Sequence, residues 1–195
     1  MGKLIINTQL SLDGVMQGPG GPDEDTSGGF EHGGWAMQYF DEQMSKDAGE
    51  GMGSAAGLVL GRRTYEIFAA YWPNQGDDNP FAGFLNSVPK YVASRSLQEP
   101  LEWNNSHLLQ GDVPEAIRKL KEDGEGDLVM LGSGELAQTL MEHGLIDEYQ
   151  LWVVPVVLGE GKPLFREGLS KTPLKLVDST TSSTGVAMLT YQPES

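Results

Sequence analysis

The sequence predicts an α/β fold in a single domain, with a mostly parallel sheet covered by helices on both faces. Strand-like and helix-like segments alternate along most of the 195 residues, without an internal repeat or a low-complexity linker. Two short apolar runs, GLVLG at 57–61 and LVMLG at 128–132, end at glycine and lead straight into helix-like segments. Another helix has a clear beginning, because Asp112 can cap it and Pro114 and Glu115 follow in its first turn.

The other elements follow from apolar periodicity and from the residues that end each segment. A helix over 36–48 would place Ala36, Phe40 and Met44 on one face, with Gly49 as its stop. The predicted strands are 3–10, 57–60, 90–94, 106–109, 127–131, 149–158 with an interruption at Pro155, 174–179 and 186–191. The other predicted helices are 62–70, a helix that starts at Asp112 and stops at Gly124, and 134–143.

Residues 11–35 form a long glycine-rich loop between the first strand and the first helix. A loop of this length inside a compact domain is usually either disordered or functional. Met16, Phe30 and Trp35 stand among the glycines, and these apolar side chains favour a functional loop.

Composition excludes several classes of function. The net charge is −15 and the pI is about 4.4, which argues against nonspecific binding to nucleic acids or anionic membranes. The chain has no cysteine, so disulfides, thiol nucleophiles and cysteine-bound metals are excluded. His32, His107 and His143 have no partner at metal-ligand spacing, so we expect no metal site. No apolar run is long enough to span a bilayer, and we expect a cytoplasmic protein.

The two strand–glycine–helix junctions predict an anion site. A helix that starts directly after a strand directs unpaired N–H groups and the positive end of its dipole above the sheet. Glycine permits close approach of a ligand, and Arg62, Arg63 and Thr64 follow the first junction. Two such junctions suggest a ligand with several phosphates, most simply a dinucleotide. The alternatives are glycine turns without a ligand and arginines that extend into solvent.

The second junction, GSGELA at 132–137, matches the pattern GxGxxA. A standard Rossmann domain is disfavoured, because Asp147 and Glu148 come too soon to be its ribose-binding acid. Ser94, Arg95 and Ser96 follow another strand, and hydroxyls with a guanidinium suit a phosphate monoester such as the 2′-phosphate of NADP. A polar turn is the alternative at 94–96.

Two carboxylates are candidates for the chemistry. Asp13 follows the first strand in the segment SLDG, where it can orient a substrate or relay a proton. Asp-Gly is also a common turn pair, so an Asx-type turn remains open at this position. Asp41 lies on the first predicted helix, where a solvent-facing role is the alternative.

The order of SLDG, GRRTYE, VASRS, VMLGSGEL and IDEYQLWVVPVVLGEGKPLF resembles the dihydrofolate reductase superfamily. The chain is most similar to the branch that resembles the reductase domain of riboflavin biosynthesis enzymes. The resemblance covers nearly the whole chain, and its most specific part runs from Asp147 to Phe165. It implies one dihydrofolate reductase-like domain over 1–195, with an eight-stranded mostly parallel sheet, four helices and an antiparallel last strand.

The resemblance also implies a site for NADPH across the carboxyl ends of the strands, with 16–35 as an active-site loop that covers the nicotinamide. The implied cofactor-binding residues are Thr8, Val15, Met16, Gly61, Arg62, Arg63, Thr64, Ser94, Arg95, Leu131, Gly132, Ser133, Gly134, Glu135 and Leu136. The implied substrate-binding residues are Gln9, Trp35, Phe40 and Phe68. Asp13 and Asp41 are the catalytic candidates.

The activity that the resemblance implies is hydride transfer from NADPH to a small heterocycle, either pterin-like or pyrimidine-like as in 5-amino-6-(5-phosphoribosylamino)uracil reductase. The small-molecule substrate would be the only partner besides a second copy of the chain, with no nucleic acid or membrane. The alternatives are an NADP(H)-binding protein without turnover and a structural or interaction domain.

The resemblance further implies a homodimer. The stretch 156–158 and the closing hairpin 174–191 are apolar and have no obvious partner element in the chain, so a two-fold dimer would cover them. The alternative is a monomer in which 159–173 folds back over the preceding strand.

Overall fold

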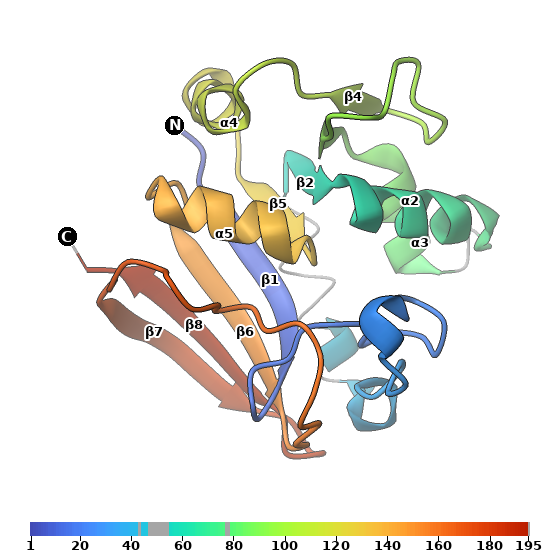
Figure 1. Ribbon diagram of the computed structural model, residues 1–195, viewed down its shortest axis with the longest axis vertical. Helices are drawn as coiled ribbons and strands as arrows, with labels where there is room; N and C mark the ends of the chain where they lie inside the picture. Colours follow the sequence, from blue (N-terminus) through green and yellow to red (C-terminus); the bar gives the residue numbers. More distant parts are fainter. Residues whose placement is uncertain (43, 47–54, 77–78, 195) are drawn as a thin grey trace.

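The computed structural model describes residues 1–42, 44–46, 55–76 and 79–194, and it contains one eight-stranded sheet (Figure 1). The strand order is β4-β3-β2-β5-β1-β6-β8-β7. The strands are β1 (Leu4–Ser11), β2 (Gly57–Gly61), β3 (Lys90–Ala93), β4 (Ser106–Leu108), β5 (Leu128–Leu131), β6 (Glu148–Val154), β7 (Leu174–Thr181) and β8 (Ala187–Pro193). The α-helices are α2 (Arg62–Tyr71), α3 (Pro80–Ser87), α4 (Val113–Asp123) and α5 (Gly134–Glu142).

The sheet is parallel from β4 through β6, and β8 runs antiparallel to both of its neighbours. Six strands therefore end at the same edge of the sheet. This arrangement confirms the predicted fold class, including the antiparallel last strand.

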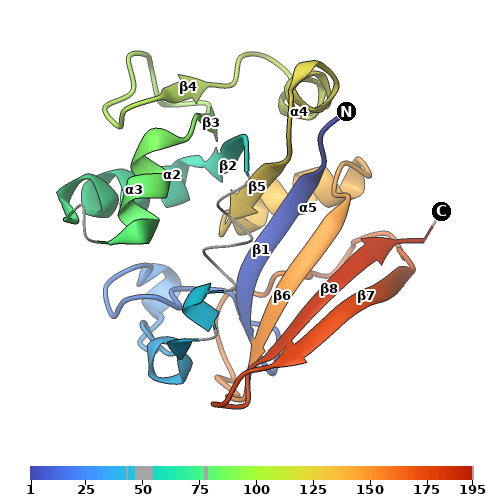
Figure 2. The same cartoon turned by 180° about the vertical axis from the view of Figure 1, so that it is seen from behind.

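The strands are buried on both faces, which explains their nearly continuous apolar sequences. On β1, Leu4 and Ile6 belong to one buried cluster and Ile5 to another. On β2, Val59 and Leu58 are divided between the same two clusters. Helix α5 covers the first face in Figure 1, and α3 lies over the opposite face in Figure 2.

A third cluster lies between the glycine-rich loop and the end of the sheet at β6 and β8. Its central residues include Phe30 and Trp35 from the loop and Trp152 from β6, each of them buried. The packing of these aromatic side chains makes this part of the loop a component of the core rather than a surface flap.

The predicted helix over 36–48 is wrong over 36–41, whereas residue 42 and residues 44–46 are helical. A 3-10 turn covers Met37–Tyr39, and Phe40 is extended at φ −71° and ψ 128°. The extended conformation brings the Phe40 ring to 5.9 Å from that of Trp152, so packing on β6 outweighs helical periodicity. The predicted stop at Gly49 lies outside the described residues.

Three further expectations need correction. Strand β6 ends at Val154, because the chain bends at Pro155, which has no N–H for the ladder. Helix α3 was not predicted, although Asn79 caps it by accepting the N–H of Phe81 at 3.0 Å and Pro80 stands in its first turn. The closing hairpin does have a partner in the chain, since β8 pairs with β6 from Tyr149 to Val153.

Candidate functional site

The strand order brings the two predicted phosphate-binding junctions together. Strand β2 lies directly beside β5, so the turn after Gly61 and the turn after Leu131 meet at the carboxyl edge of the sheet. Helices α2 and α5 begin there, and their first turns point N–H groups at the same region. The sequence interpretation of two neighbouring strand–glycine–helix junctions therefore agrees with the geometry.

Side chains lock the two turns to each other. The Ser133 hydroxyl accepts the N–H of Gly61 at 2.8 Å, and the N–H of Ser133 donates to the Thr64 hydroxyl at 3.1 Å. Gly132 and Ser133 both have left-handed φ values, 58° and 62°. A Cβ on Gly132 would lie 3.3 Å from the side chain of Thr64, so glycine is required there by both conformation and space.

The start of α5 has two neighbours from distant segments. A Cβ on Gly134 would lie 3.0 Å from Sδ of Met16 and 3.8 Å from Nη2 of Arg166. Met16 was predicted for the cofactor site, whereas Arg166 was missed. Arg166 follows a loop rather than a strand, so no strand–glycine–helix signal marked it. Arg166 reaches the start of α5 because the 159–173 segment folds back onto this helix.

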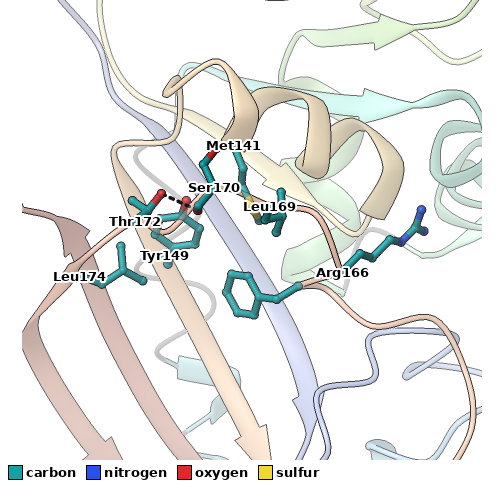
Figure 3. A pocket seen from close by; sticks show the side chains of 8 residues that line it. Met141, Tyr149, Arg166, Leu169, Ser170, Thr172 and Leu174 are labelled. Atoms are coloured by element: carbon teal, nitrogen blue, oxygen red, sulfur yellow. Dashed lines mark hydrogen bonds between the residues drawn. The ribbon is translucent and has the colours of Figure 1, made fainter.

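A shallow cavity of about 190 Å³ lies on the other side of Arg166, near the end of α5. Figure 3 shows that the Arg166 side chain points away from this cavity, toward the beginning of α5. The cavity is lined by Met141, Tyr149, Phe165, Arg166, Leu169, Ser170, Thr172 and Leu174. Burial raises the pKa of Tyr149, which agrees with its largely apolar surroundings.

The two adjacent arginines of α2 point to different partners. Arg62 forms an exposed ion pair with Glu66 at 3.3 Å, one turn further along the helix. Arg63 instead donates to the Asp25 carboxylate at 3.2 Å and to the Ser27 hydroxyl, both in the glycine-rich loop. Both guanidinium groups remain at the carboxyl edge of the sheet, where the sequence placed them.

Ser94 and Arg95 follow the end of β3, the next strand beyond β2. The Ser94 hydroxyl accepts the N–H of Leu97 at 3.0 Å and that of Ser96, so it closes a turn of its own chain. Arg95 is exposed and has no hydrogen-bond partner among the residues that the structure describes. Arg95 is thus the more available of the two predicted 2′-phosphate ligands.

Asp13 is an anchor for a turn. Its carboxylate accepts the Ser11 hydroxyl at 2.7 Å and the N–H groups of Leu158 and Gly159 at 3.1 and 2.7 Å. These hydrogen bonds, that of Ser11 above all, lower the pKa of Asp13 to about 2. The carboxylate is therefore ionised at neutral pH and serves as a hydrogen-bond acceptor, and its catalytic role stays a prediction.

Asp41 also makes structural contacts. Its carboxylate accepts the N–H of Met44 at 2.9 Å, and it accepts the N–H and hydroxyl of Ser183 at 2.9 and 2.6 Å. These bonds join the start of a helical segment to the turn between β7 and β8. These hydrogen bonds give the Asp41 carboxylate a structural role that needs no substrate.

The predicted substrate-binding aromatics do not meet in one place. Trp35 is 6% exposed, and its indole N–H donates to the Gln17 carbonyl at 2.8 Å. Phe40 packs near Trp35 in the same cluster, whereas Phe68 belongs to the cluster under α2 and α3. Phe68 meets Trp103 edge-on at 6.5 Å. Trp35 is thus a core residue and Phe68 is half-buried against another cluster, so the two do not line one surface, and their substrate-binding role stays a prediction.

The nicotinamide side of the predicted site lies at the end of β1. Thr8 and Gln9 are consecutive on this strand, so their side chains point to opposite faces of the sheet. Thr8 is buried and Gln9 is half-buried. Val15 and Met16 return beside the strand end, where Val15 forms a bridge with Pro163. Only one of Thr8 and Gln9 can therefore face a given ligand.

Among the described residues, no cluster of three or more histidine, cysteine or acidic side chains is arranged to hold a metal ion. Across the same residues, no helix has the length and apolar character needed to cross a membrane.

Comparison with known proteins finds a matching family and a relative of similar length. The model of the RibD C-terminal domain family matches residues 2–188. The uncharacterized protein YyaP of Bacillus subtilis (strain 168) is 28% identical over 194 residues, which cover 97% of this chain and 94% of YyaP.

Two solved structures share the fold. A protein from Shewanella sp. PV-4, named for riboflavin biosynthesis, superimposes with a TM-score of 0.71 at 22% identity, covering 99% of each chain. Dihydrofolate reductase from Enterococcus faecalis, solved with NADP(H) and RAB-propyl, gives a TM-score of 0.62 at 14% identity. That match covers 99% of this chain and 97% of the reductase.

Proposed function

We propose that this chain, which belongs to the RibD C-terminal domain family, is an NADPH-dependent reductase of a small heterocyclic substrate. The observation that carries the proposal is the pair of interlocked turns at Gly61 and Ser133, with the beginnings of α2 and α5 directed to one place. The Enterococcus faecalis enzyme of the same fold was solved with NADP(H), which supports the choice of cofactor.

The residues at this edge fit a dinucleotide. Gly132 and Gly134 let Thr64 and Met16 pack closely against the turn before α5, and the first N–H groups of α5 would receive a ligand's phosphates. Arg62 and Arg95 stand at neighbouring strand ends, where they would hold a 2′-phosphate. In a chain of net charge −15, this local gathering of cations favours an anionic ligand.

When bound, NADPH would supply a hydride for a C=N or C=O bond of a pterin-like or pyrimidine-like substrate. Thr8, Val15 and Met16 would border its nicotinamide at the end of β1. The protein's part is to position the reactants and to exclude water, with the glycine-rich loop as one wall.

An NADP(H)-binding protein without turnover is the second candidate. It is favoured by one observation: the carboxylates of Asp13 and Asp41 both serve as structural acceptors, so neither is placed as a proton donor. A dihydropterin or pyrimidine reduction that takes its proton from solvent would still agree with the first candidate.

The test is a fluorescence titration with NADPH and with NADH, followed by assays of NADPH oxidation with dihydrofolate, pterins and pyrimidine intermediates. We expect saturable binding of NADPH and oxidation with at least one of these substrates. Binding without oxidation would select the second candidate, and the absence of binding would exclude both.

A further inference from the structure

The carboxylate of Asp25 lies between two cations that belong to different segments. Its Oδ1 accepts from Nη1 of Arg63 at 3.2 Å, and its Oδ2 accepts from Nζ of Lys162 at 2.7 Å. The Ser27 hydroxyl accepts from both cations and donates to Asp25. One loop carboxylate therefore joins the first turn of α2 to the segment that follows β6.

Burial and charge show how firmly this carboxylate is held. The Asp25 side chain is 14% exposed, and those of Arg63 and Lys162 are 54% and 37% exposed. Burial by itself would raise the pKa of Asp25, but the hydrogen bonds from Lys162 and Ser27 outweigh burial and lower it. Asp25 is thus an anion at neutral pH and pairs with both cations, while the further acids Asp23, Glu24 and Glu66 lie around the same arginine.

The loop around Asp25 is fixed to the same place by Gln17. Its Nε2 donates to the carbonyls of Asp25 and Ser27 at 3.0 and 2.9 Å, and its Oε1 accepts the N–H of Lys162 at 3.1 Å. These contacts, together with those of Arg63, join residues 17–27 to α2 and to the segment after β6.

We propose that Asp25 is an internal stand-in for a phosphate: it occupies Arg63 and Lys162 until the diphosphate of the bound cofactor displaces it. The inference rests on the proposed function. Carboxylate and phosphate oxygens are both anionic acceptors for a guanidinium. Arg63 lies in the first turn of α2, next in sequence to Thr64, whose hydroxyl accepts the N–H of Ser133 in the turn after β5.

The structure has room for the exchange. A hollow of about 330 Å³ adjoins Arg63 and is bordered by the loop over 23–27 together with Glu66 and Ile67 of α2. The hollow is open at the surface, so the Asp25 carboxylate has space beside it into which it can move away from the arginine. Asp25 thereby opposes binding of the cofactor and couples it to a movement of residues 23–27.

The test compares the dissociation constant for NADPH in wild type, Asp25→Asn and Asp23→Asn by fluorescence titration at low and high salt. Asp23 is an exposed acid of the same loop, so it controls for the general loss of one negative charge. We expect Asp25→Asn to bind NADPH about two- to fivefold more tightly than Asp23→Asn, the range for one exposed ion pair, with a smaller difference at high salt. Equal or weaker binding by Asp25→Asn would overturn the proposal and make Asp25 a residue that merely positions Arg63.

Hydrogen exchange of the wild-type protein gives a second readout that needs no variant. Addition of NADPH is expected to speed exchange at 25–29, while exchange in the core strands stays unchanged or slows. Unchanged exchange over 25–29 at saturating NADPH would contradict the displacement, although the proposed reductase would stand. If neither wild type nor Asp25→Asn binds NADPH, the proposed function fails, and this inference fails with it.

Discussion

The Ser133 hydroxyl accepts the backbone N–H of Gly61 at 2.8 Å, although 72 residues separate the two positions. The bond joins the turn after β5 to the turn after β2, and Thr64 returns a bond to the N–H of Ser133. Two helix beginnings are thereby held in a fixed relation. Each turn is common by itself, and their coupling supports the proposal of a ligand with more than one phosphate.

Gly134→Val is expected to abolish binding of NADPH while the fold is retained. The new side chain would meet Met16 at the start of α5 and stand between the backbone and the pyrophosphate. The measurement is a fluorescence titration together with circular dichroism. Gly83→Val is the matched control, because a Cβ on Gly83 of α3 meets nothing within 4 Å. Normal NADPH binding by folded Gly134→Val would show that the turn at 132–134 does not hold the phosphates.

Arg95→Gln is expected to reduce the preference for NADPH over NADH. One or two charge-assisted contacts to the 2′-phosphate contribute about 1–3 kcal/mol, and NADH has no such phosphate. The two dissociation constants are measured for wild type, Arg95→Gln and the control Arg118→Gln, whose arginine lies on α4 beside Glu115. If wild type binds both cofactors equally, the assignment of Arg95 loses its basis.

Stability is expected to rise with pH between about 8 and 9.5 because of Lys90. This lysine is fully buried, with Nζ donating to the carbonyls of Asn86 and Asn104 at 3.1 and 2.7 Å and lying 4.3 Å from the centre of the Trp103 ring. Burial lowers its pKa from 10.5 to about 8, so in this range the unfolded chain binds more protons than the native one. Stability therefore increases as pH rises through the native pKa.

The measurement is urea unfolding across this pH range, with Lys90→Met as the variant whose profile should be flat by comparison. The range stops near 9.5 because burial raises the pKa of Tyr149, and ionisation of tyrosine in the unfolded chain acts in the opposite direction at higher pH. A wild-type profile as flat as that of Lys90→Met would contradict a neutralising lysine at this position.

A two-fold dimer remains a prediction. Strand β7 is an edge of the sheet, and its Leu176 and Val177 are 47% and 44% exposed, a surface that a second copy can cover. Light scattering should give twice the chain mass of 21.1 kDa, and Leu176→Glu should give one chain mass. Met37→Glu, at another exposed apolar position, is the control. A wild-type mass of 21.1 kDa would exclude the dimer and favour the folded-back monomer.

The meeting of the two strand–glycine–helix junctions could be predicted from the sequence because its signals are local. A strand, a glycine and a helix beginning occupy fewer than ten consecutive residues, and the parallel sheet then brings such junctions to one edge. The cap at Asp112 was predicted for the same reason, and its carboxylate accepts the N–H of Glu115 at 2.9 Å. Local backbone chemistry determines these features.

The part of the candidate site formed by the glycine-rich loop and the 159–173 segment depends on tertiary contacts, which no local sequence pattern predicts. Trp35 and Phe40 looked like ligand-binding aromatics, but apolar packing on β6 determines their place. Arg166 and Lys162 reach the site from a segment that folds back over α5 and β1. Even the specific motif at Asp147 has a structural role, since its carboxylate accepts the N–H of Leu4 at 2.7 Å and pairs with Lys121 at 2.6 Å.

The central position of β1 has a consequence for biosynthesis. Its two neighbours in the sheet are β5 and β6, which begin at Leu128 and Glu148, so β1 has no partner in the sheet until synthesis has passed Leu128. The apolar segment Leu4–Ile6 must remain unpaired on the ribosome for that time, and loop closure over such a separation slows folding. The nascent chain thus has its greatest exposure to aggregation and to chaperones before the second phosphate-binding turn leaves the ribosome.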